Sequence, residues 1–121
     1  MVLHHLDKEK GILRLEPKGK LESQDFESIE TEVTRFLRDN GKLKGLMVKT
    51  EEFPGWSDLE ALFAHLDFVK TNHNKVERVA VVSDDSLMQT GAPAVNLIID
   101  AEMKTFELSD ESVAEEWLKA A

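Results

Sequence analysis

Two short uncharged apolar runs, Leu46–Val48 and Val79–Val82, constrain the fold of this chain more than any other feature. Neither run alternates between apolar and polar residues, which is typical of strands buried on both faces. About thirty residues separate them, enough for the helical crossover that two parallel strands need. The sequence therefore predicts parallel strands joined by β-α-β connections.

The N-terminal residues predict an antiparallel hairpin before these runs. A short strand over Val2–Leu6 is followed by the polar turn Asp7–Gly11. The next stretch, Ile12–Glu16, alternates, with Leu13 and Leu15 on one face. Two strands joined by a short polar turn that contains glycine favour a hairpin.

A helix is predicted between the hairpin and the first apolar run. Its apolar residues recur at the spacing of one helical stripe. They are Phe26, Ile29, Val33, Phe36 and Leu37. Ser23 or Asp25 can cap its start, and Gly41 can end it in the left-handed conformation.

The C-terminal part predicts an edge strand and a last helix. Glu102–Leu108 is polar for a strand, which suits a sheet edge. We expect Ser109 to cap the helix, with Asp110 and Glu111 in its first turn and Val113 and Trp117 facing inward. The predicted order is β-β-α-β-α-β-α-β-α in a single domain over residues 1–121.

The charge of the chain argues against several ligand classes. Its 121 residues carry 24 acids against 15 bases, a net charge of −9, which opposes binding to nucleic acid and to anionic lipid. There is no cysteine, no signal-peptide pattern and no apolar run long enough to span a membrane, so we expect a cytoplasmic protein. His4 and His5 point to opposite faces of a strand, while His65 and His73 are eight apart, so no metal site is expected.

Ser57 begins the helix that follows the first apolar run. With Glu60 it matches the capping box, which explains the serine as a structural cap. A serine at a helix N-terminus also suits phosphorylation, because the helix dipole tolerates negative charge there. The surrounding residues resemble a serine-hydrolase elbow, but its second glycine and its late histidine are missing. We therefore expect no catalysis and no cofactor.

Two apolar features lie where a polar surface is usual. The helix after Ser57 carries a second apolar stripe, Ala61, Ala64 and Phe68, opposite its core stripe. The segment Ser86–Ile99 contains no charged residue. Burial inside the fold explains both features; the alternatives are a flap over an apolar pocket, or a surface that meets a membrane or another subunit.

Four segments together resemble the SpoIIAA-like family of bacterial STAS-fold proteins, the fold of sulfate transporters and anti-sigma-factor antagonists. They are Phe53–Trp56, Glu77–Val82, Ala101–Phe106 and Ala114–Leu118. The resemblance implies a mixed α/β sheet with an antiparallel first strand, helices mainly on one face, and no catalysis. In the antagonists a kinase modifies a serine at the position of Ser57, although their Asp-Ser-(Ser/Thr)-Gly pattern is here Trp-Ser-Asp.

The SpoIIAA-like branch is also similar to CRAL-TRIO lipid-binding domains, which implies an apolar pocket. We therefore expect a non-enzymatic module that binds a small apolar or lipid-like ligand, with peripheral membrane association. The predicted ligand-binding residues are Trp56, Leu62, Phe68, Leu87, Met88, Val95 and Ile98. The alternative is a regulatory protein–protein module switched by phosphorylation of Ser57. A homodimer through the same apolar faces is compatible with either.

Overall fold

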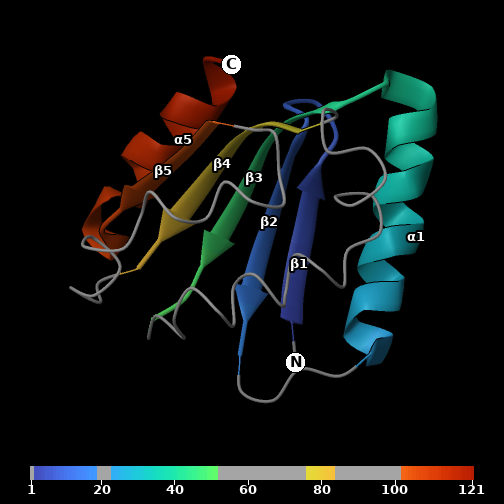
Figure 1. The fold of residues 1–121 in the computed structure, drawn as a ribbon, viewed down its shortest axis with the longest axis horizontal. Helices are drawn as coiled ribbons and strands as arrows, with labels where there is room; N and C mark the ends of the chain where they lie inside the picture. Colours follow the sequence, from blue (N-terminus) through green and yellow to red (C-terminus); the bar gives the residue numbers. More distant parts are fainter. Residues whose placement is uncertain (1, 19–22, 52–75, 84–101) are drawn as a thin grey trace.

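The structure, a computed structural model, describes residues 2–18, 23–51, 76–83 and 102–121. Its strands form one sheet in which the spatial order follows the chain, β1-β2-β3-β4-β5 (Figure 1). The strands are β1 (Val2–Asp7), β2 (Ile12–Pro17), β3 (Leu43–Lys49), β4 (Val76–Val82) and β5 (Glu102–Phe106). β1 pairs with β2 antiparallel, and the other neighbours pair in parallel. This confirms the mixed α/β sheet with an antiparallel first strand.

The turn between β1 and β2 is held by its first and last residues. The Asp7 carboxylate accepts hydrogen bonds from the backbone N–H groups of Glu9 and Lys10, each at 3.1 Å. The bond from the Lys10 N–H is the main cause that lowers the pKa of Asp7. Gly11 has a φ of +69°, which favours glycine, and its carbonyl accepts the N–H of Lys44 at 2.8 Å. The turn is thereby tied to the start of β3.

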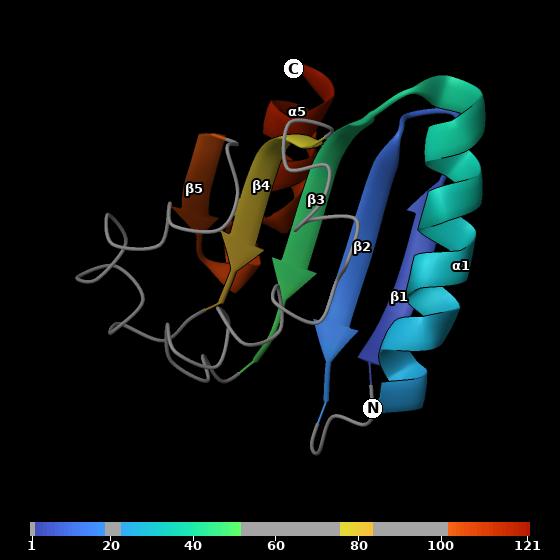
Figure 2. The ribbon, with the colours of Figure 1, turned by 45° about the vertical axis from the view of Figure 1, so that its right-hand side comes forward.

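Helix α1 (Ser23–Asn40) covers one face of the sheet (Figure 2). The five apolar residues predicted to form its stripe are all buried, and they pack against strand residues such as Leu13, Leu46 and Val79. Gly41 follows the helix with a φ of +88°, and its N–H bonds the Leu37 carbonyl at 2.8 Å. The predicted helix and its glycine stop are confirmed, and Asp25 lies in its first turn.

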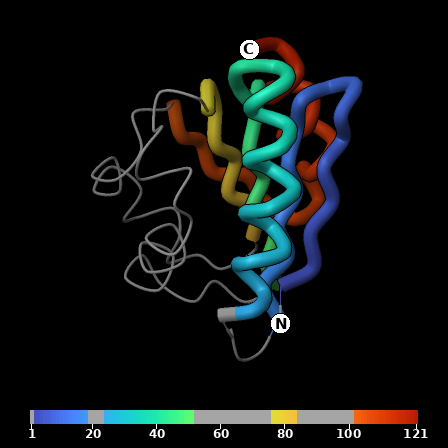
Figure 3. Tube along the Cα trace, turned by 90° about the vertical axis from the view of Figure 1, so that its right-hand side faces the viewer, coloured from blue at the N-terminus to red at the C-terminus, as the bar shows by residue number. Residues whose placement is uncertain are grey.

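Helix α5 (Glu111–Lys119) covers the other face, after the short 3-10 helix η3 (Leu108–Asp110) (Figure 3). Ala114 and Leu118 are fully buried against Met47, Ala80 and other residues on that side of the sheet. The helix lies so close to β3 that a Cβ on Gly45 would sit 2.8 Å from the Cβ of Leu118. A glycine in β3 therefore permits the contact.

Three predictions about the C-terminal part were wrong in detail. Val113 is 55% exposed, because Ala114 and Leu118, four residues apart, form the inward stripe. Ser109 lies within η3, and the residue at the N-cap of α5 is Asp110. β5 ends at Phe106 instead of Leu108, which belongs to η3. Trp117 is half-buried and packs against the α5 side of the core, as expected.

The helices expected after Ser57 and within Ser86–Ile99 lie outside the described residues. Within the described part, each face of the sheet carries one helix. The central strands β3 and β4 are therefore buried on both sides, with Leu46 and Val48 facing α1 and Met47 facing α5. This explains why their sequences do not alternate.

Candidate functional site

The residues predicted to bind a ligand lie outside the described part of the chain. This holds for Trp56, Leu62, Phe68, Leu87, Met88, Val95 and Ile98, and for Ser57. The structure does describe the strands that precede them in the sequence. The sheet edge at which those strands end is therefore the part of the candidate site that the structure describes.

The parallel strands β3, β4 and β5 end at one edge, which we call the carboxyl edge. Two backbone bonds continue the pairing there: the Thr50 N–H donates to the Val82 carbonyl, and the Ser83 N–H donates to the Phe106 carbonyl, each at 3.0 Å. Ser83 is fully buried. In open α/β sheets, ligands and partners approach at this edge. Ser57 and the charge-free Ser86–Ile99 both follow it in the sequence.

A cluster of three charged side chains, the Glu111 clamp, lies on the α5 side near this edge. The Glu111 carboxylate, from the first turn of α5, pairs with Lys49 of β3 at 2.6 Å and with Arg14 of β2. The three side chains are between 26% and 31% exposed, so the cluster is partly shielded from water. The clamp joins the helix to two strands.

Each partner in the clamp favours the charged form of the others. Hydrogen bonds from Lys49 and then from Arg14 lower the pKa of Glu111. The bond to Glu111 in turn raises the pKa of Lys49. A general acid or base works best with a pKa near the working pH, and these shifts move both groups away from neutrality. The clamp is thus suited to holding α5 in place and poorly suited to proton transfer.

A second contact holds the other end of α5. The Arg78 guanidinium lies 4.9 Å from the centre of the Trp117 ring and donates to the Trp117 carbonyl at 2.6 Å. That carbonyl is in the last turn of α5, where carbonyls lack partners within the helix. Lys104 lies 5.8 Å from the same ring, whose centre is 5.8 Å from that of Phe106. Both ends of α5 are therefore fixed to the sheet by charged side chains.

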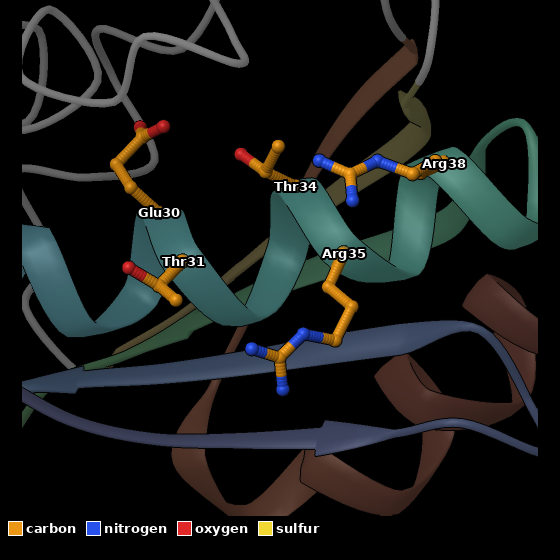
Figure 4. Close-up of a pocket in the computed structure, with 5 residues that line it drawn as sticks. All are labelled: Glu30, Thr31, Thr34, Arg35 and Arg38. Atoms are coloured by element: carbon orange, nitrogen blue, oxygen red, sulfur yellow. The ribbon is translucent and has the colours of Figure 1, made fainter.

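A shallow depression of 340 Å³ lies on the outer surface of α1, on the opposite face of the sheet from the Glu111 clamp (Figure 4). Its lining is polar and comes from one helix: Glu30, Thr31, Thr34, Arg35 and Arg38. The sequence alone gives no signal that these residues form a site. These threonines and arginines are polar residues on the exposed face of α1, so they belong to no apolar stripe. Only their spacing along the helix could have indicated that they lie on one surface.

The described residues contain no group of three or more His, Cys, Asp or Glu side chains that could hold a metal ion. His4 instead pairs with Glu32 of α1 at 3.1 Å. Across the described ranges, no helix is both long and apolar enough to cross a membrane.

The Glu111 clamp was also missed at the level of sequence. Arg14 and Glu111 are 97 residues apart, so no local spacing connects them. The alternation of β2 did place Arg14 on a face opposite Leu13, and Glu111 was expected in the first turn of the last helix. What could not be predicted was that the last helix packs on that face.

Comparison with protein families gives one match that covers most of the chain. A family model described as SpoIIAA-like matches residues 12–119. Comparisons with curated proteins and with solved structures give no significant match. The similarity to CRAL-TRIO domains has no support among these comparisons.

Proposed function

Because the chain belongs to the SpoIIAA-like family, we propose that it is a non-enzymatic regulatory module of the STAS type that acts by binding another protein. The family match over residues 12–119 is the observation that carries this proposal. The charged groups described at the carboxyl edge agree with it, since they form fixed ion pairs and offer no acid–base pair for catalysis.

The proposed docking surface is the carboxyl edge, with Ser57 as its switch. Ser57 follows the end of β3 by eight positions and stands where the related antagonists carry their phosphorylated serine. A phosphoryl group would add about two negative charges to a stretch of sequence that already contains Glu51, Glu52 and Asp58. Like-charge repulsion from these carboxylates, and the cost of desolvating the added charge in an interface, would therefore release the partner.

The test begins with a partner recovered by pull-down and identified by mass spectrometry. Its affinity is then measured by biolayer interferometry for wild type, Ser57→Ala and Ser57→Asp. We expect Ser57→Asp to weaken binding by about tenfold or more, which corresponds to about 1.4 kcal/mol. Ser28→Asp is the matched control, because it introduces the same charge at an exposed position of α1. Equal affinity of Ser57→Asp and Ser57→Ala would contradict the switch.

A second candidate function is binding of a small apolar or lipid-like ligand. It is favoured by the charge-free segment Ser86–Ile99 and by the second apolar stripe ending at Phe68, both in an acidic chain. Native mass spectrometry of the purified protein tests it and reads the oligomeric state in the same spectrum. We expect a bound lipid in wild type, its retention in Leu3→Ala, and its loss in Phe68→Ala. Leu3 is the control because it is apolar and 44% exposed on β1. An unliganded monomer that ignores liposomes and fatty acids would exclude this function.

A further inference from the structure

The depression on α1 contains two pairs of side chains that repeat at the spacing of one helical turn. Thr31 and Arg35 form one pair, and Thr34 and Arg38 form the other, each four residues apart (Figure 4). Side chains at this spacing lie on the same face of a helix, with the longer one reaching back over the preceding turn. The Arg38 guanidinium accordingly points toward Thr34 in Figure 4.

Among the described residues, no carboxylate neutralises either arginine of the depression. Within the described part of the chain, Arg35 and Arg38 form no ion pair, although acids outnumber bases 24 to 15 in the sequence. The positions four residues before them, where glutamate would pair best, are threonines. Glu32, three residues before Arg35, pairs instead with His4 at 3.1 Å.

From this arrangement we infer that the depression is a binding site for a phosphoryl group, a tetrahedral dianion. Each guanidinium offers a planar fork of donors that matches two phosphoryl oxygens. In Figure 4 Thr34 lies on the side of the helix that carries the Arg38 guanidinium, and its hydroxyl can donate a further hydrogen bond. The Arg35 guanidinium points the other way in this view, so it must swing back to contact the same anion. Thr31 cannot do the same, since its hydroxyl donates to the Glu27 carbonyl at 3.0 Å.

The rest of the molecule sets the strength of this site. Among the five lining residues that the structure describes, Glu30 is the one carboxylate, so these five carry a net charge of +1. The chain as a whole carries −9. Binding of a free anion should therefore be weak and should weaken further as salt is added. A phosphorylated side chain of a partner protein and a free phosphate offer the same chemistry, and the experiment separates them.

The experiment is a titration of the ¹⁵N-labelled chain followed by NMR at low ionic strength. Inorganic phosphate, phosphoserine and a phosphoserine peptide are added in turn, with sodium chloride at matched ionic strength as the blank. We expect shifts confined to the amides of residues 30–38. In Arg35→Gln/Arg38→Gln the affinity should fall by about tenfold or more, because two charge-assisted contacts are lost. In Thr34→Val it should fall by a few-fold, roughly the effect of one neutral hydrogen bond.

The matched control is Lys8→Gln/Lys44→Gln, which removes the same two charges from exposed lysines outside the depression. This variant should bind as wild type does. Tighter binding of the peptide than of inorganic phosphate assigns the site to a phosphorylated partner, and equal binding assigns it to a free phosphate. Shifts reproduced by sodium chloride, or unchanged affinity in the double arginine variant, would overturn the site. Neither result depends on Ser57, so failure here leaves the proposed function standing.

Discussion

The two faces of the sheet are built differently. On the α1 face, the described residues form a continuous apolar cluster in which strand and helix side chains alone make the contacts. On the α5 face, the cluster has only six fully buried members among the described residues, and charged groups border it. The Glu111 clamp holds the first turn of α5, and Arg78 holds its last turn.

The two helices are attached to the sheet in different ways. α1 is long enough to bury five apolar side chains, so the hydrophobic effect fixes it. α5 has nine residues and fully buries only Ala114 and Leu118, so less apolar area is available. Ion pairs and a cation–π contact supplement the packing there, and each contributes far less than a buried leucine. The α5 face should therefore be less stable and more sensitive to pH and salt.

The strongest test of this contrast compares one core truncation on each face. Ile29→Ala, on the α1 face, should lower the free energy of unfolding by about 3–4 kcal/mol, because it leaves a cavity in a fully apolar cluster. Leu118→Ala should cost about 2 kcal/mol, at the lower end for such a change, since its cluster is small. Urea denaturation measures both. Equal losses would show that the two faces are packed equally well.

The close approach of α5 to β3 gives a second test. Gly45→Ala places a Cβ 2.8 Å from Leu118, so α5 must shift, and we expect a loss of about 1–3 kcal/mol. Combining it with Leu118→Ala frees the space, and the double variant should be more stable than the sum of the two losses by about 1 kcal/mol. Strictly additive losses would mean that α5 already adapts without strain. Gly41→Ala is no substitute as a control, because its φ of +88° adds backbone strain.

The sequence predicted one face much better than the other, and the reason is physical. Helical periodicity is a local signal, and it correctly gave α1, its buried stripe and its glycine stop. The uncharged apolar runs of β3 and β4 are also a local signal. They correctly predicted that both strands are buried on two faces and pair in parallel. The α5 face depends on contacts between distant residues, such as Arg14 with Glu111, which no local pattern encodes. For a helix this short, Val113 and Ala114 fit the periodicity about equally well, so Val113 was wrongly predicted to face inward while Trp117 was placed correctly.

The site could be predicted less well than the fold. Composition and resemblance identified the turn before Ser57 and the charge-free segment as candidate sites. They do not show how the residues of these segments are arranged in space. The depression on α1 gave no sequence signal, because threonine and arginine on an exposed helix face are unremarkable one at a time. Their significance depends on the two arginines having no ion pair among the described residues, and the structure shows that Glu32 pairs with His4 instead.

The smallest effect in this comparison concerns the Glu111 clamp. Glu111→Gln removes the charge that two cations share, and it should lower the free energy of unfolding at pH 7 by about 1 kcal/mol. Glu116→Gln is the control on the same helix, because its carboxylate is 73% exposed and its one ion pair within the described ranges is with Lys119, three residues on. It should change stability by less than about 0.5 kcal/mol.

The clamp also predicts that the stability of the fold depends on pH, and the sign of this dependence follows from the lowered pKa of Glu111. Its pKa is lower in the folded chain than the ordinary value of 4.5, so the unfolded chain binds the proton more tightly. The stabilisation is therefore complete above the unfolded pKa and is lost as the pH falls through the folded pKa. Urea midpoints of wild type and Glu111→Gln should converge as the pH is lowered from 7 toward 3, while those of wild type and Leu118→Ala stay apart. A constant gap for Glu111→Gln across this range would mean that the carboxylate charge contributes nothing, and that packing alone attaches α5.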